Sequence, residues 1–90
     1  MRAPSYTSQF RRDVKLAEKR GKDLAKLRLV LHLLINEEPL PQRLRDHRLK
    51  GVRKSYRDLH IEPDWLLIYK ADDATVIFER TGTHADLFDE

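Results

Sequence analysis

The sequence predicts an α+β fold, in which an N-terminal strand and a helical hairpin pack on one face of a small, mostly antiparallel sheet. Two stretches with apolar residues at helical spacing come early in the chain. Strand-like runs joined by short turns follow a pair of prolines. A chain of 90 residues is long enough for one modest core, so residues 1–90 are expected to form a single domain.

The helices and the strand before them occupy the first 36 residues. A short strand is expected over 2–6, and a first helix over 7–20 that a hydroxyl side chain caps at its start. Gly21 is a plausible stop for that helix, and Asp23 can cap a second helix over 23–36. Two helices joined by about two residues should pack as an antiparallel hairpin.

The sheet is expected from the second half of the chain. Prolines within 39–41 end the helical pattern, and a loop of basic residues follows. Strands are expected over 54–61, 65–70 and 75–80, with a tight turn at 72–73. The middle run is apolar on both faces and should be the central strand, whereas the tail after it is short and polar.

Charge is distributed unevenly along the chain, whose net charge is +3. Residues 43–57 hold seven cations and one acid, whereas 72–90 hold six acids and one base. This asymmetry suggests a polyanionic partner at the basic segment, although a solvated charged surface would explain it equally well. There is no cysteine, and the most apolar run, 27–35, is too short and too polar for a membrane span, so the chain is expected to be cytoplasmic.

Polar residues alternate with apolar ones in the strand expected over 54–61. If the helices cover Leu59 and Ile61, then His60 points to the open face of the sheet. His47, Asp64, Arg80 and His84 can converge on the same edge. His32, on the second helix, is expected to be structural or simply exposed.

These side chains suit metal-free RNA cleavage better than metal binding, because their spacing matches no helical ligand pair or compact Cys/His cluster. Histidine can take the proton of a 2′-hydroxyl and protonate the leaving oxygen, while Arg80 can bind phosphate. Trp65 and Phe88 can stack on bases. Core packing for Trp65 and a hydrophobic clasp for Phe88 are the alternatives.

Five runs of the sequence form a specific combination: SQFRRDVKLA, LLIN, LPQRLRDHRLKG, YRDLHIEPDWLLIYK and FERTGTHADLF. From about Tyr6 to Phe88 they resemble the YafQ branch of the RelE superfamily of bacterial toxins. The resemblance implies a RelE-like fold and a ribosome-dependent mRNA interferase without a cofactor. It also implies a DinJ-like antitoxin that wraps and neutralises the toxin and through which the complex binds operator DNA.

The same motifs imply the site residues. Matching this sequence to the family's motifs gives the site residues His47, His60, Asp64, Arg80, His84 and Phe88. The resemblance does not assign the acid and the base.

We expect His84 to be the general acid, because a tail residue can close over bound RNA, and His47 to be the likelier base. His60 and Asp64, brought together by the turn at Pro63, are expected to be functional partners. Phosphate contacts to the ribosome are expected from the basic segment, at Lys50, Arg53 and Lys54. Two other classes stay open: a non-catalytic RNA- or ribosome-binding module, and a regulator that docks through its acidic tail.

Overall fold

A five-stranded sheet with strand order β1-β5-β4-β3-β2 forms the centre of the computed structural model, which describes residues 1–51 and 55–88. β1 runs parallel to β5 and the other neighbours are antiparallel, so the sheet is mostly antiparallel as the sequence predicts. The elements are β1 (Ala3–Tyr6), α1 (Ser8–Lys19), α2 (Leu24–Ile35), the 3-10 turn η1 (Gln42–Leu44), β2 (His47–Arg48), β3 (Arg57–Glu62), β4 (Trp65–Ala71), β5 (Thr75–Gly82) and α3 (His84–Phe88).

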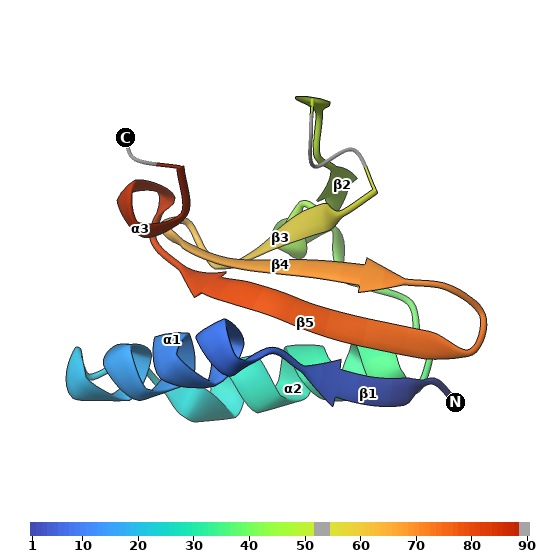
Figure 1. Ribbon diagram of the computed structural model, residues 1–90, viewed down its shortest axis with the longest axis horizontal. Coiled ribbons are helices and arrows are strands. Elements are labelled where there is room, and N and C mark those ends of the chain that lie inside the picture. The colour runs from blue at the N-terminus through green and yellow to red at the C-terminus, as the bar shows by residue number, and fades with distance from the viewer. Residues whose placement is uncertain (52–54, 89–90) are drawn as a thin grey trace.

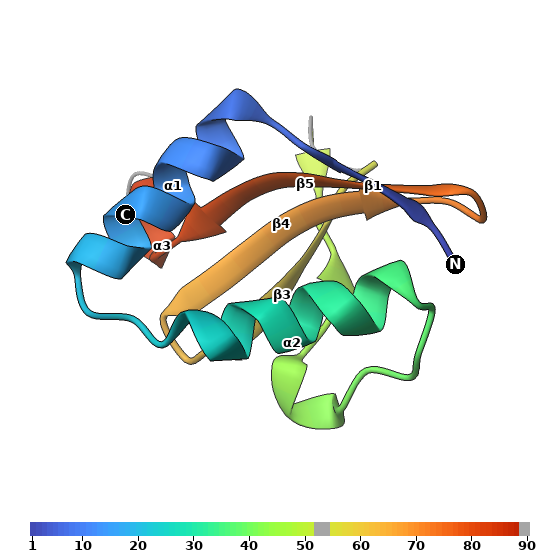
Figure 2. The same cartoon turned by 90° about the horizontal axis from the view of Figure 1, so that it is seen from below.

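The two long helices begin at the expected caps. The side chains of Thr7 and Asp23 accept hydrogen bonds from Phe10 N and Ala25 N, at 2.9 and 3.0 Å. Gly21 follows α1 with φ +82°, a conformation that glycine adopts without strain. Both helices cover one face of the sheet (Figure 1), but they diverge from the turn between them (Figure 2). The two helices therefore pack mainly on the sheet and not along each other as the expected hairpin would.

The main core lies between these helices and the sheet, and β4 is its central strand as predicted. Its buried members are Phe10, Ala17, Leu27, Val30, Leu34, Leu44, Leu59, Ile61, Trp65, Leu67, Tyr69, Val76 and Phe78. The helices therefore do cover Leu59 and Ile61, and His60 lies on the opposite face. No helix in residues 1–51 and 55–88 is long and apolar enough to cross a membrane.

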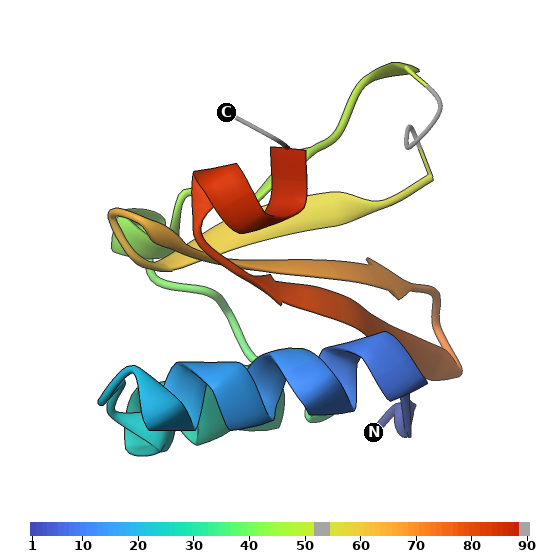
Figure 3. The same cartoon turned by 60° about the vertical axis from the view of Figure 1, so that its left-hand side comes forward.

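Two elements differ from the sequence prediction. The basic loop contains β2, which pairs with β3, and two residues are too few to give a periodic signal. The tail contains the short helix α3 on the face opposite α1 and α2 (Figure 3), where Leu87 packs with Leu66 and Ile68. The expected strand start at Lys54 lies outside the described residues, and β3 is described from Arg57.

Reciprocal hydrogen bonds hold the start of α3. Thr83 Oγ1 accepts from Asp86 N at 3.1 Å, and Asp86 Oδ2 accepts from Thr83 N at 2.9 Å. Arg20 donates to the same carboxylate at 2.6 Å, which ties α3 to the end of α1 and holds the pKa of Asp86 well below its usual range. A Cβ at Gly82 would lie 2.9 Å from Asp86 Oδ2, so this close approach requires glycine. The cap fixes the backbone of the adjacent residue, His84.

Candidate active site

Three imidazoles from three separate elements form a row on the face of the sheet that carries α3. The ring centroids of His47 on β2 and His60 on β3 are 6.4 Å apart, and those of His60 and His84 at the start of α3 are 5.6 Å apart. The Phe88 ring continues the row, 6.5 Å from His84. The predicted convergence of histidines on one edge of the sheet is therefore present.

Asp64 pairs with His84. Its Oδ1 accepts from the His84 backbone N at 2.9 Å and lies 2.6 Å from the imidazole Nδ1. The His84 backbone N–H and then its ring hold the pKa of Asp64 below the usual range. Because the carboxylate occupies Nδ1 of His84, Nε2 is the ring nitrogen left to contact a ligand. The expected pairing of Asp64 with His60 is wrong, because the hairpin turn directs this carboxylate across the sheet toward α3.

His60 has a neutral partner instead. Its Nδ1 lies 3.2 Å from the carbonyl oxygen of Pro63, which can only accept a hydrogen bond. Nδ1 therefore carries the proton, and in the neutral ring Nε2 has the free lone pair. Pro63 contributes its carbonyl at the turn, and so the turn orients His60.

His47 contacts a partner through each ring nitrogen. Nδ1 lies 2.8 Å from the carbonyl oxygen of Arg45, a residue in the left-handed region with φ +53°. Nε2 lies 2.9 Å from Oδ1 of Asp58, close enough for an ion pair but not aligned for a hydrogen bond.

The neighbouring Asp46 holds this segment against the sheet, since its carboxylate accepts from Arg57 at 2.7 Å and from the hydroxyl of Tyr69. Burial, together with the Asp46 carboxylate, raises the pKa of Tyr69 far above its usual range, so the phenol keeps its proton. The backbone that presents His47 is thus fixed by charge and hydrogen bonding.

Asp58 is a site residue that the sequence did not single out. Its side chain lies on the histidine face, and the residue is only 3% exposed. Burial raises its pKa, and the positive charges of His47, His60 and His84 oppose that shift. The alternation of Tyr56, Asp58 and His60 placed it on this face, but only the paired strands show that it is buried.

Arg80 already has a carboxylate partner. Its Nε and Nη2 donate to Asp13 of α1 at 2.9 and 3.1 Å, and Asp13 also accepts from Thr81 N at 3.1 Å. Asp13 holds the pKa of Arg80 above its usual value. One edge of the guanidinium is thus occupied, while Nη1 donates to none of the residues in the described part of the chain.

The two aromatic candidates differ. Trp65 is 1% exposed, belongs to the main core and donates from Nε1 to Thr81 Oγ1 at 2.9 Å. The expected stacking of Trp65 on bases is therefore wrong, because the ring faces the helices. Phe88 is half-buried against the cluster of Leu66 and Ile68 and lies beside His84, so it both holds down the tail and presents ring surface to the site.

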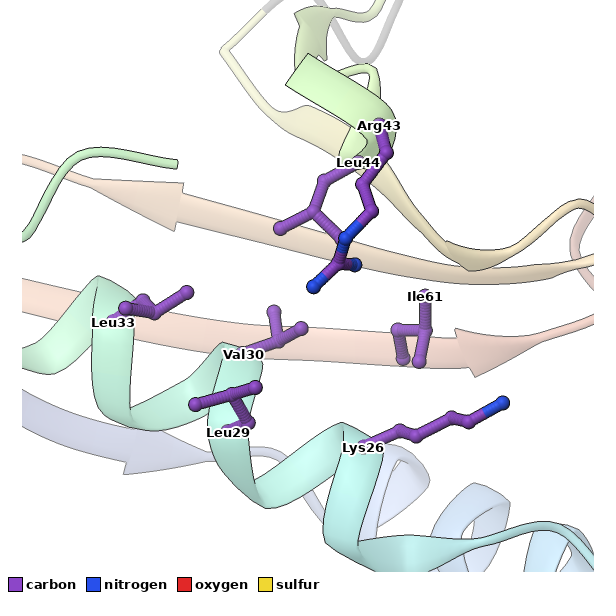
Figure 4. A pocket seen from close by; sticks show the side chains of 7 residues that line it. All are labelled: Lys26, Leu29, Val30, Leu33, Arg43, Leu44 and Ile61. Atoms are coloured by element: carbon purple, nitrogen blue, oxygen red, sulfur yellow. The ribbon is translucent and has the colours of Figure 1, made fainter. Parts of the chain in front are cut away.

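The other candidates lie on the surface or outside the described residues. Lys50 is exposed, whereas Arg53 and Lys54 fall outside residues 1–51 and 55–88. His32 is exposed on α2, in line with the simplest expectation for it. A separate apolar groove on the helix side runs between α2 and η1 (Figure 4). Among the described residues, its lining is apolar apart from Lys26 and Arg43, so it lacks the imidazoles and carboxylates of the histidine row.

No group of three or more His, Cys, Asp or Glu side chains within the described residues is arranged to hold a metal ion. Asp58 and Asp64 each face a different imidazole, so the donors do not converge on one point. The arrangement instead offers an imidazole whose Nδ1 contacts a carbonyl next to one whose Nδ1 contacts a carboxylate.

Comparison with known proteins shows the family of this chain. The sequence model of the family described as "Bacterial toxin of type II toxin-antitoxin system, YafQ" matches residues 2–89. The mRNA interferase toxin YafQ of Escherichia coli (strain K12) is 57% identical over 84 residues, which cover 92% of this chain and 91% of that protein.

Solved structures with the same fold are also similar in sequence. The crystal structure of the E. coli DinJ-YafQ toxin–antitoxin complex contains a chain that matches with a TM-score of 0.91 and 56% identity, over 97% of each chain. A metal-bound toxin from Helicobacter pylori matches with a TM-score of 0.90 and 37% identity, over 98% of this chain and 100% of that one.

Proposed function

Because this chain belongs to the YafQ family of toxins from type II toxin–antitoxin systems, we propose that it is an endoribonuclease that cleaves ribosome-bound mRNA and so stops translation. The E. coli relative is named an mRNA interferase toxin, which supports RNA as the substrate. We propose that the reaction needs no metal ion, because imidazoles can carry out both proton transfers.

Cleavage proceeds by attack of the RNA on its own backbone. His60 Nε2 removes the proton from a 2′-hydroxyl, and the resulting oxygen attacks the adjacent phosphorus. The bond from phosphorus to the 5′-oxygen breaks, and His84 Nε2 gives its proton to that oxygen. The products carry a 2′,3′-cyclic phosphate and a 5′-hydroxyl, and solvent restores the two imidazoles to their starting protonation.

Hydrogen bonding of the Nδ1 atoms supports this division of roles. The partner of His60 is a carbonyl, which holds a proton on Nδ1 and leaves Nε2 as the nitrogen that can accept the 2′ proton. The partner of His84 is a carboxylate, which occupies Nδ1 and leaves Nε2 as the nitrogen that can donate a proton to the leaving oxygen. The 5.6 Å between the two rings leaves a phosphate within reach of both. This pair of unlike imidazoles is the observation that carries the proposal.

Other residues bind rather than exchange protons. The free edge of Arg80 and the charge of His47 offset charge on the phosphorane, and Phe88 stacks on a base next to the scissile phosphate. Lys50 contacts ribosomal RNA together with Arg53 and Lys54, which lie outside the described residues.

The antitoxin is a DinJ-like protein, as the complex of the E. coli relative suggests, and the toxin–antitoxin complex binds operator DNA through it. The toxin acts in the cytoplasm, where mRNA is translated.

The test is cleavage of a defined mRNA by the purified chain, with and without ribosomes and with and without EDTA. We expect cuts in ribosome-bound mRNA that survive EDTA and leave cyclic phosphate ends. Cuts that require added metal would contradict the metal-free mechanism. Binding to ribosomes without any cleavage would instead favour the non-catalytic RNA- or ribosome-binding module, and normal growth at high expression without antitoxin would remove the toxin activity altogether.

A further inference from the structure

We propose that Asp58 is a positioning residue that acts through His47: its Oδ1 lies 2.9 Å from Nε2 of the imidazole, and the two side chains form a fixed ion pair at one end of the imidazole row. Its effect on catalysis rests on the proposed RNA cleavage, whereas the Asp58–His47 pair itself exists in the free protein.

Strand pairing brings the two residues together. His47 of β2 and Asp58 of β3 are directly opposite each other in the antiparallel register, so their side chains project to the same face. Asp58 is almost fully buried there, whereas the side chain of His47 is 55% exposed. The imidazole thus lies over the carboxylate and separates it from solvent.

Hydrogen bonding fixes the number of protons in the pair. The Arg45 carbonyl requires a proton on Nδ1 of His47. If Nε2 had no proton, this electron-rich nitrogen would lie 2.9 Å from the Asp58 oxygen, and the two would repel. A proton on Nε2 removes this repulsion and gives the ring the positive charge that pairs with the carboxylate.

The charged groups that face Asp58 come from three elements. His47 of β2, His60 of β3 and His84 of α3 stabilise its negative charge, whereas Asp46 opposes it. Its Oδ1 is buried and accepts no aligned hydrogen bond from any residue in the described ranges. A buried carboxylate oxygen without an aligned hydrogen bond does not stabilise a fold, so stability does not account for this residue.

The pair has a consequence for the reaction. With Nδ1 on a carbonyl and Nε2 against a carboxylate, His47 cannot accept the 2′ proton while the pair is intact. Asp58 therefore leaves His60 as the base and keeps His47 as an oriented, proton-bearing group beside the phosphate. This departs from the sequence-based expectation that His47 is the likelier base.

The decisive variant is Asp58→Asn, which keeps the shape and removes the charge. We expect cleavage to fall by at least about tenfold, as for other carboxylates that orient a histidine, and the alkaline limb of its pH profile to move to lower pH. The unfolding free energy at neutral pH should be unchanged or higher. Asp73→Asn, at the exposed β4–β5 turn, is the matched control and should change neither property.

A second measurement needs no RNA. In the free protein, NMR should show that the His47 ring loses its proton at lower pH in Asp58→Asn than in the wild type. An unchanged His47 titration would overturn the proposal even if cleavage fell, and so would cleavage within threefold of wild type. A wild-type chain that fails to cleave would contradict the proposed function alone, because the titration still reports on the pair.

Discussion

Two aspartate–histidine pairs at opposite ends of one imidazole row have opposite electrostatic character. Asp64 is exposed and accepts two N–H groups from His84, and these hydrogen bonds lower its pKa. Asp58 is buried against His47 without an aligned donor, and burial raises its pKa. The residue types are the same, so the difference comes from solvent access and hydrogen-bond direction.

The comparison teaches that a carboxylate next to a histidine does not by itself define a role. The exposed pair occupies only Nδ1 of its histidine and leaves Nε2 to exchange a proton with substrate, which suits a general acid. The buried pair occupies both nitrogens of its histidine, which suits orientation and charge. Between them, His60 has only a carbonyl on Nδ1 and is the one suited to accept a proton.

The largest effect is expected at the exposed pair. His84→Ala should lower the rate of mRNA cleavage by roughly 10²- to 10⁴-fold, the usual contribution of a general acid. Single-turnover cleavage on programmed ribosomes measures it, and circular dichroism checks the fold. His32→Ala, an exposed histidine on α2, is the control. Cleavage by His84→Ala within threefold of wild type would remove His84 from this role.

A smaller loss is expected at its partner. Asp64→Asn should slow cleavage by about tenfold or more, because the amide keeps the backbone contact to His84 but loses the charge that favours the imidazolium. As the pH is raised, the cleavage rate of this variant should begin to fall at a lower pH than that of the wild type. A double variant, Asp64→Asn with His84→Ala, should be no slower than His84→Ala alone, since the two act as a unit. If the losses in cleavage rate of the two single variants added up in the double variant, Asp64 and His84 would act independently.

The two carboxylates should also affect stability with opposite signs. The pKa of Asp64 is lowered in the fold, so its contribution is favourable above the unfolded-state value of about 4 and is lost as pH falls through the folded value. The pKa of Asp58 is raised, so its contribution is unfavourable above the folded value and disappears below the unfolded one.

Urea unfolding from pH 3 to pH 8 measures this contrast. Asp64→Asn should be less stable than wild type only toward neutral pH, whereas Asp58→Asn should gain stability over the same range. If Asp58→Asn were instead less stable than the wild type at neutral pH, favourable interactions of the Asp58 charge would outweigh the cost of burying it.

The aromatic neighbour of the exposed pair should affect substrate binding more than chemistry. Phe88→Leu keeps the apolar packing on Leu66 and Ile68 but loses the ring beside His84. Stacking on a base is worth about 1–3 kcal/mol, so the RNA concentration for half-maximal rate should rise while the maximal rate changes less. An unchanged concentration dependence would leave Phe88 with a packing role only.

The smallest effect on cleavage is expected at Trp65. Trp65→Phe removes the hydrogen bond to Thr81 inside the core and should cost about 1–3 kcal/mol of unfolding free energy, since Thr81 loses a buried partner. Cleavage of saturating substrate should stay within about threefold once the variant is folded, which thermal unfolding confirms. A large loss of RNA binding in a folded variant would return Trp65 to the RNA-binding surface.

Local chemistry was sufficient to predict most of the fold from the sequence. The caps at Thr7 and Asp23, the turn at Gly21 and the central apolar strand depend on neighbouring residues and on short-range periodicity. The tail helix was missed although Thr83 and Asp86 have the spacing of a reciprocal cap, a local signal that identifies the start of α3.

The sequence by itself determined the fold class, the family and which histidines gather at one edge of the sheet. Only the tertiary structure decided their partners. Asp64 meets His84 across 20 positions, and Arg80 meets Asp13 across 67, because strand register and the placement of α3 bring them together. Burial is equally non-local. Trp65 and Asp58 belong to the same hairpin, yet opposite faces of the sheet make one a core residue and the other a buried charge.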